Sequence, residues 1–509
     1  MLDLADAGGT ELAQREVDAD RAVRIRVVHA RGIRLAGCNG GYFHVCFDVR
    51  VDRRTVLRAA LISGAGVAAA AALPMAAHAV APARRSLPRP LATLVTRWDT
   101  DPWARGAYSV LPPGVSPATR RVLADARLGG RIMLAGEYTS PGRPSTTTGA
   151  HDSGRYAARA LASSTPARVI VVGAGLAGAT AAADLVARGV DVSVLEARDR
   201  VGGRIRTDLT WGVPVELGAS WIHGRRGNSI VSLAAEAGLG LAPTDYDDAI
   251  ARDTATGRRS PAAERRWDRL DALLAELAYT ESPVTQDVGG WLRAHGWRDD
   301  RLAAWAAQVE VTQEYGRDPG RLGVRAAQEG VDYLGGDAMV VGGYSRIPEL
   351  LLEGVDVQLS TPAVSVAASR DGVLVTTADG RVLRADGAIV AVPLAILRAG
   401  TMSITPMTAE VASAITALRT GDLEKVILRY AEPWWGDKQV IGVVGGGAPG
   451  AHAGSAAALR WTEFYPLTDV IGMPALMGLS GGSSARARPH SDAACAAEAV
   501  AALDAAFAL

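Results

Sequence analysis

The sequence predicts an α/β protein in which a nucleotide-binding domain with a parallel sheet is joined to a second domain of mixed α+β structure. Arg168–Val172 is a short β-branched run typical of a buried parallel strand, and a glycine-rich turn follows it directly. A second such run, Asp191–Leu195, lies beyond an alanine-rich helical stretch that reaches about Arg188. The chain has 509 residues, of which 48% are hydrophobic. That is enough to bury a large core and favours two domains over one.

The glycines after the first strand have the spacing of a Rossmann-like dinucleotide-binding motif. Gly173 permits a tight turn, Gly175 lets the backbone approach a pyrophosphate, and Gly178 lets the helix pack closely on the strand. The helix N-terminus then faces the phosphates, and Glu196, at the end of the second strand, can accept hydrogen bonds from a ribose. A glycine triplet alone could be an ordinary turn. Strand, triplet, helix, strand and acid in this order predict nucleotide binding, with NAD and FAD both open.

The composition excludes other classes of partner. Lys+Arg and Asp+Glu are balanced at 54 each, so no global field points to nucleic acid or to an anionic membrane, and a small-molecule ligand is favoured. Cys38 and Cys46 lie upstream of a predicted export signal, and Cys495 alone follows it, so we expect neither a disulfide framework nor a thiolate metal site. The basic residues are almost all arginine, because Lys425 and Lys438 are the only lysines in the sequence.

An export signal is predicted near the start of the chain. The twin arginines of Asp52–Leu57 precede an apolar stretch, Ala59–Ala77, and the cleavage-type sequence Ala77-His78-Ala79. A transmembrane anchor is the alternative, but glycines and a proline weaken the stretch as a membrane span. We therefore expect 1–79 to be a presequence for the twin-arginine route to the periplasm or the exterior. Because such signals begin shortly before their arginines, we also expect the true start near Val49 or Val51.

A second glycine motif decides between the two dinucleotides. Arg198 is followed by Gly202, Gly203 and Arg204, in a segment that resembles the motif after the ribose acid in FAD enzymes of the amine oxidase and phytoene desaturase superfamily. The two glycines would let the backbone pass close to the cofactor, and Arg204 would supply a fixed positive charge beside phosphate. A Gly-Gly surface turn with a solvated arginine is the alternative. The resemblance implies FAD, bound by a domain of the glutathione reductase and amine oxidase type.

Three further segments resemble the polyamine and monoamine oxidase branch of that family. Gly212–Gly224 is similar to the flavin-lining segment, which implies that Gly218, Ala219 and Ser220 run along the flavin and that His223 projects into the substrate pocket, although a structural histidine stays open. Within 340–366, the resemblance implies that the backbone of Val364 contacts the adenine. Asp422–Tyr430 resembles the strand that carries the family's lysine, here Lys425, which is thought to assist flavin reoxidation through a water. The alternative is a solvent-facing charge on an alternating strand.

The closing segment that the family carries at its C-terminus is found here in front of the glycine motif. Thr96–Ser109, Gly130–Glu137 and Thr147–Gly154 resemble it, in an order that indicates a circular permutation in which joining Leu509 to about Pro90 would restore the usual sequence. By that resemblance Glu137 would bind the ribose-phosphate region, Thr148 and Gly149 would meet the flavin edge, and Tyr108 would sit near the pocket. Thr146 stands where many relatives have an aromatic residue, which puts an aromatic cage around the amine in doubt. The expected domain parts are 91–123, 246–339 and 416–509 for the substrate-binding domain, and 124–245 and 340–415 for the FAD-binding domain.

The resemblance implies an FAD-dependent amine oxidase, an oxidoreductase that acts on CH–NH or CH–NH2 groups. A neutral amine would pass a hydride equivalent to the flavin, the imine would hydrolyse to an aldehyde, and O2 would be reduced to H2O2. Acidic residues between Glu310 and Glu329 could bind distal cations of a polyamine, or could equally be solvated helix charges. An L-amino-acid oxidase on the same fold and an inactive flavin-binding relic are the alternatives.

Overall fold

The computed structural model describes residues 15–17, 23–25, 87–331, 333–445 and 458–507. The chain divides into two compact units, Met1–Val67 and Ala68–Leu509. In the first unit, β1 (Arg15–Val17) and β2 (Val23–Ile25) form an antiparallel pair. The predicted export signal lies outside the described residues. All that follows concerns the second unit.

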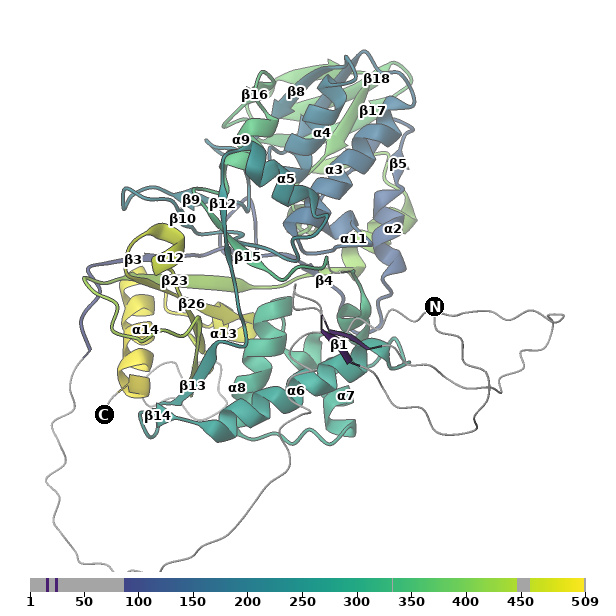
Figure 1. Ribbon diagram of the computed structural model, residues 1–509. Coiled ribbons are helices and arrows are strands. Elements are labelled where there is room, and N and C mark those ends of the chain that lie inside the picture. The colour runs from purple at the N-terminus through teal and green to yellow at the C-terminus, as the bar shows by residue number, and fades with distance from the viewer. Residues whose placement is uncertain (1–14, 18–22, 26–86, 332, 446–457, 508–509) are drawn as a thin grey trace, which may run out of the picture. The chain divides into compact units, whose positions relative to one another are not determined.

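A six-stranded sheet contains the predicted nucleotide-binding strands (Figure 1). Its order is β16 (Asp356–Gln358), β8 (Asp191–Leu195), β7 (Arg168–Val172), β20 (Gly387–Val390), β6 (Ile132–Leu134) and β5 (Arg127–Leu128). All neighbouring strands are parallel except β5 and β6. The predicted strand, turn, helix and strand are confirmed, because α4 (Leu176–Val186) connects β7 to β8.

This sheet is covered on both faces, as its continuous apolar strands require. One face packs against α4 and α3 (Thr147–Ala162), with alanines at the contact. The two helices approach so closely that a Cβ on Gly154 would lie 2.2 Å from the carbonyl oxygen of Ala177. The other face packs against a four-stranded sheet of order β19 (Val382–Ala385), β18 (Gly372–Thr377), β17 (Ala363–Ser369) and β21 (Ser403–Thr405).

A second large sheet is mixed and has seven strands. Its order is β14 (Arg258–Arg259), β13 (Ala249–Asp253), β24 (Val440–Val444), β25 (Glu463–Pro466), β26 (Ala475–Gly481), β23 (Leu423–Arg429) and β3 (Ala92–Val95). The alanine-rich helix α14 (Asp492–Phe507) buries one face of it. The neighbouring helices are α6 (Pro261–Tyr279), α7 (Val288–Ala294), α8 (Arg301–Ala307) and the π-helical η2 (Gln308–Gln313).

Short elements join the two large sheets. Three small sheets pair β9 (Thr207–Asp208) with β10 (Val215–Glu216), β4 (Ser109–Val110) with β22 (Arg419–Thr420), and β15 (Ala338–Val341) with both β11 (Trp221–Ile222) and β12 (Gly240–Pro243). The remaining helices are α2 (Ala118–Ala124), α5 (Ser229–Glu236), α9 (Arg346–Leu351), α10 (Leu394–Ala399), α11 (Ala409–Ala417), α12 (Thr468–Ile471), α13 (Gly482–Arg486), η1 (Glu137–Thr139), η3 (Pro319–Arg321) and η4 (Val324–Gln328).

The residues that precede β7 contribute to both large sheets. β3 is an edge strand, antiparallel to β23, with Val95 opposite Val426. β6 is parallel to β20, with Ile132 opposite Ala388. Among the described residues, none of the helices has both the length and the apolar character needed to span a membrane.

Candidate functional site

Gly173, Gly175 and Gly178 have different structural roles in the turn after β7. Gly173 has φ +104°, and a Cβ on Gly178 would lie 1.9 Å from the carbonyl oxygen of Gly173, so the helix can approach the turn only without a side chain. A Cβ on Gly175 would meet only the carbonyl oxygen of Gly202, at 3.9 Å. Gly175 also begins α4 without a side-chain cap, so the amides of the first helical turn are left for a phosphate group.

The second glycine motif faces this turn. Gly202 bridges to Gly175, and its amide donates to the carbonyl of Ala174 at 2.8 Å. A Cβ on Gly203 would lie 3.4 Å from the Cα of Gly175. Glu196 accepts hydrogen bonds from the amides of Ala174 at 2.7 Å and Arg198 at 2.9 Å. The two motifs thus form one backbone cradle with an acid beside it, which fits a dinucleotide.

Two ion pairs join this cradle to the front segment, the part of the chain from Thr96 to Gly154 that precedes the first glycine motif. Arg198 binds Asp101 with two hydrogen bonds of 2.8 and 2.7 Å. Arg204 binds Glu137 at 2.8 Å. Burial raises the pKa of Glu137, but Arg204 and the Ser109 hydroxyl outweigh it and hold the pKa below its usual value. The structure therefore brings Glu137 together with Arg204 of the second glycine motif, and its expected contact with the ribose-phosphate region stays a prediction.

Glu137 is also the centre of a buried polar network. Its carboxylate accepts from the Ser109 hydroxyl at 2.6 Å and from the Ser145 amide at 3.2 Å. The fully buried Arg120 donates to the Ser109 hydroxyl at 2.7 Å and binds Glu329 through two bonds of 2.8 Å. Glu329, one of the acids considered for binding a substrate cation, is thus an ion-pair partner of Arg120.

The N-terminus of α3 holds the other expected flavin contacts. Thr146 is the N-cap and accepts the Gly149 amide at 2.9 Å, which gives this unexpected threonine a structural reason. A Cβ on Gly149 would lie 1.8 Å from the Arg143 carbonyl oxygen, so only glycine fits. The buried Thr148 hydroxyl donates to Asn228 at 3.2 Å.

Lys425 lies on β23 with 4% of its surface exposed, so the alternative of a solvent-facing charge is wrong. Its Nζ donates to the carbonyl oxygens of Gly218 at 2.6 Å and Glu216 at 3.3 Å, and is hydrogen-bonded to the Ser220 hydroxyl. Burial lowers the pKa of Lys425 to about 7, although the nearby Glu216 carboxyl acts in the opposite direction. Lys425, Gly218 and Ser220 therefore form one cluster, which also holds the adjoining Ala219.

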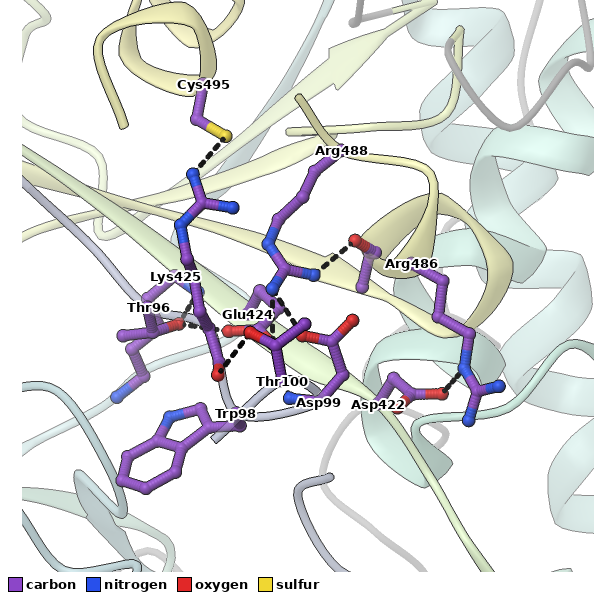
Figure 2. Close-up of polar contacts among 12 residues, drawn as sticks. Thr96, Trp98, Asp99, Thr100, Asp422, Glu424, Lys425, Arg486, Arg488 and Cys495 are labelled. Atoms are coloured by element: carbon purple, nitrogen blue, oxygen red, sulfur yellow. Dashed lines mark hydrogen bonds and ion pairs between the residues drawn. The ribbon is translucent and has the colours of Figure 1, made fainter. Parts of the chain in front are cut away.

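A second network clamps Lys425 from the front segment (Figure 2). The Thr96 hydroxyl accepts the Lys425 amide at 2.7 Å and donates to Glu424 at 2.6 Å. Glu424 also accepts the Asp99 amide at 3.2 Å. The Arg488 guanidinium pairs with the carboxylates of Asp99 and Glu424. Burial raises the pKa of Glu424, and Arg488 opposes that rise. The main chain of Lys425 is thus held by residues more than three hundred positions away.

His223 pairs with an acid that the motif does not contain. Its Nδ1 lies 2.8 Å from Asp337, which also accepts the Gly224 amide at 2.9 Å and the Tyr246 hydroxyl at 3.1 Å. β11 and β15 bring the two together, since Ile222 is opposite Ala338. Trp221, two residues before His223, packs edge-on against Tyr465 at 5.1 Å, and the Lys425 Nζ lies 5.8 Å from the Trp221 ring.

Two expected residues lie apart from these contacts. The Tyr108 hydroxyl donates to the carbonyl oxygens of Gln313 at 2.7 Å and Glu314 at 2.9 Å, so it anchors the chain to the end of η2. Val364 is the bulged residue of β17 and is 38% exposed. Its neighbour Thr361 donates its amide to the Glu196 carbonyl at 2.7 Å. Among the described residues, no hydrogen bond or ion pair joins Tyr108 or Val364 to the two glycine motifs, and their roles stay predictions.

Sequence reasoning missed the residues that act through long-range contacts. They are Thr96, Asp99, Asp101, Ser109, Arg120, Glu216, Asp337, Glu424 and Arg488. Several of them lie inside segments that carry the family resemblance, which is the signal that could have drawn attention to them. Glu216 belongs to the flavin-lining segment, and burial raises its pKa to about 7. No cluster of His, Cys, Asp or Glu within 87–331, 333–445 and 458–507 is arranged to hold a metal ion.

Known proteins are similar to this chain in sequence and in fold. The sequence model of the family described as "Flavin containing amine oxidoreductase" matches residues 68–162, 176–322 and 326–508. Polyamine oxidase 3 of Oryza sativa subsp. japonica is 30% identical over 338 residues, which cover 62% of this chain and 67% of the relative. Polyamine oxidase 2 of Arabidopsis thaliana is 29% identical over 309 residues, 54% of this chain and 61% of the relative. Lysine-specific histone demethylase 2 of Homo sapiens is 31% identical over 292 residues, 53% and 35% respectively.

A solved structure of putrescine oxidase bound to putrescine superposes with a TM-score of 0.52 at 21% identity, covering 67% of this chain and 81% of that one. At that identity the likeness supports the fold alone. The family match covers most of the chain, and the two glycine turns with the uncapped start of α4 fit a dinucleotide. The chain therefore belongs to the flavin containing amine oxidoreductase family, whose cofactor is FAD.

Proposed function

We propose that this protein is an amine oxidase that converts a diamine or polyamine to an imine, which hydrolyses to an aldehyde, while O2 is reduced to H2O2. The observation that carries the proposal is the burial of Lys425 against the segment of Gly218 and Ser220. When bound, FAD supplies the acceptor for the hydride equivalent. The chain's own contribution is to hold the cofactor in the glycine cradle, keep Lys425 buried and orient the amine.

The surroundings of Tyr465 support a cationic substrate. Burial raises the pKa of Tyr465 well above its usual value, and the neighbouring Glu463 and Glu310 carboxylates add to the rise. The indole N–H of Trp267 is hydrogen-bonded to Glu310, and Trp221 packs against Tyr465. Carboxylates and aromatic faces together are the groups that bind alkylammonium ions. Of the acids expected to bind distal cations, Glu310 therefore fits best.

His223 is proposed to orient the amine. Its Nδ1 contact with Asp337 fixes the ring, because a carboxylate partner selects the tautomer with the proton on Nδ1. Burial raises the pKa of Asp337, but hydrogen bonds from His223, Gly224 and Tyr246 hold it below its usual value. Asp337 therefore stays ionised at neutral pH and keeps this arrangement.

The decisive experiment uses the purified chain beginning near Val80. Its visible spectrum is recorded, and spermine, spermidine, putrescine, simple monoamines and L-amino acids are added without oxygen. We expect bleaching of the oxidised flavin by diamines or polyamines, followed by peroxide formation when oxygen is admitted. Bleaching by L-amino acids alone would replace the proposal with an amino-acid oxidase, and a flavin that none of them reduces would contradict oxidation of these substrates.

We also propose that the FAD-binding domain is Rossmann-like and that the chain order is circularly permuted. The pairing of β3 with β23 and of β6 with β20 supports this proposal, as does the family match on both sides of β7. The test is a rearranged chain in which 168–507 precedes 87–166 through a short linker. We expect it to fold, bind FAD and show the same amine preference; a chain that loses FAD would argue against equivalence of the two orders.

Export by the twin-arginine route is proposed from the motif alone. Replacing Arg53 and Arg54 by lysine should retain the protein inside the cell. The measurement is the distribution of flavin-containing protein between cell and exterior, with the unaltered chain as the control. Equal export of both chains would exclude this route.

A further inference from the structure

The partners of Lys425 differ in what they can donate. Two of the three atoms around its Nζ are backbone carbonyl oxygens, of Glu216 at 3.3 Å and Gly218 at 2.6 Å, and these can only accept. The third is the Ser220 hydroxyl, which can accept or donate. Three acceptors match the three protons of a lysine ammonium group.

The same three groups also satisfy the neutral amine. A neutral Nζ has two protons, which the carbonyls accept, and one lone pair, to which the Ser220 hydroxyl can donate. When Nζ is charged, the Ser220 proton can turn instead toward the Gly218 carbonyl, 3.4 Å away. Because an unsatisfied polar group is costly in a buried site, a partner that reverses its role lets Lys425 gain and lose a proton without leaving a bond unmade.

We propose that Ser220 is a positioning residue for Lys425, and that its hydroxyl changes from acceptor to donor whenever Nζ releases a proton at the reaction site. The role of Lys425 in the reaction rests on the proposed function; the hydrogen-bond exchange does not. In the step, the N–H bond that faces Ser220 breaks, and its proton passes to a water molecule that acts as the base. The Ser220 hydroxyl then rotates so that its own proton points to the new lone pair of Nζ. The electrons of the broken bond stay on Nζ, and the reverse step restores the ammonium group.

The charged groups around Lys425 agree with a proton that is exchanged near neutral pH. Burial lowers the pKa of Lys425 to about 7. The Glu216 carboxyl on β10 is the nearest acid; it is held by the Thr207 hydroxyl and the Tyr344 amide, and burial raises its pKa to about 7 as well. Glu424 precedes Lys425 in the chain, and the charged groups that surround it are Asp99 and Arg488 (Figure 2).

The lysine content makes a direct test practical. Because the chain has only Lys425 and Lys438, protein grown with lysine labelled with carbon-13 at Cε gives two signals. Lys438 is only partly buried and is paired with Asp248, so it serves as the internal reference. In the FAD-loaded protein we expect the Lys425 signal to titrate near pH 7. A Lys425 signal that titrates at the ordinary lysine value would overturn the proposal.

Ser220→Ala isolates the hydroxyl. It removes an acceptor from the ammonium form, which loses more than the neutral form because hydrogen bonds to charged groups are stronger. We expect the Lys425 pKa to fall by about one unit, a tenfold change in its protonation equilibrium, and Ser220→Thr to restore it. A Lys425 signal that titrates at the same pH in Ser220→Ala as in the unaltered protein would overturn the proposal. If that variant does not fold, Ser220→Cys must show a downward shift.

Two further measurements separate the causes. Glu216→Gln removes the nearest acid and should leave the difference between Ser220 and Ser220→Ala intact, since that difference comes from the hydroxyl; loss of the difference would contradict the proposal. Anaerobic addition of amines is recorded in parallel. Failure of every amine to bleach the flavin would refute the proposed function, whereas the lysine titration would still decide the Ser220 exchange.

Discussion

The burial of Lys425 should make the stability of the fold depend on pH. The folded pKa is about 7 against an ordinary value of 10.5. Between these values the unfolded chain holds a proton on Lys425 that the folded chain has released, so the free energy of unfolding rises with pH. The slope approaches about 1.4 kcal/mol per pH unit. Below the folded pKa both states are protonated, and the folded protein bears the full cost of burying the charged ammonium group. Above the unfolded pKa both states are neutral, and this cost is absent.

Lys425→Met removes this titration. Between about pH 7.5 and about pH 9.5 the unaltered protein should gain about 2.5 kcal/mol relative to the variant. The carbonyls that lose their partner in the variant shift its stability by a constant amount, because they do not titrate, so the difference in slope remains interpretable. The measurement is guanidinium unfolding with excess FAD, followed by circular dichroism at several pH values.

Lys438→Met is the matched control. Lys438 is the other lysine of the chain, only partly buried and paired with Asp248. We expect the Lys438 variant to follow the pH dependence of the unaltered protein. Parallel stability curves for the unaltered protein and Lys425→Met would refute the reasoning, because they would mean that Lys425 keeps its proton in the folded state.

Three further predictions follow from the site. Gly178→Ala should prevent folding around FAD, since its Cβ would lie 1.9 Å from a carbonyl oxygen, whereas Gly175→Ala, which meets nothing closer than 3.9 Å, should fold but bind FAD at least tenfold more weakly, about 1.4 kcal/mol; equal FAD affinity would contradict the cradle. Asp101→Asn breaks the paired bonds to Arg198 and should lower the free energy of unfolding by about 2 kcal/mol, measured by chemical denaturation. An unchanged denaturation midpoint would show that the ion pair does not stabilise the fold. Glu310→Gln should raise KM for a diamine about tenfold with little effect on a monoamine, and an equal effect on both would show that Glu310 does not bind the distal cation.

The sequence determined the elements whose signals are local. Arg168–Val172 and Asp191–Leu195 are strands as predicted, and α4 lies between them. The run of β-branched residues, the spacing of the glycines and the acid at the strand end all act within about thirty residues. A buried strand and a tight turn depend on side-chain shape and backbone freedom at those positions, so the sequence contains the whole argument.

The tertiary structure alone decided which charges are paired. Nothing near Arg198 indicates that Asp101 will bind it, and nothing near Lys425 indicates that Thr96 will accept its main-chain amide. Sequence could name Lys425 as a candidate but could not tell a solvated lysine from a buried one. A pKa depends on desolvation and on charges within a few ångströms, and these come from β3, β10 and β23, whose residues meet only after the chain has folded.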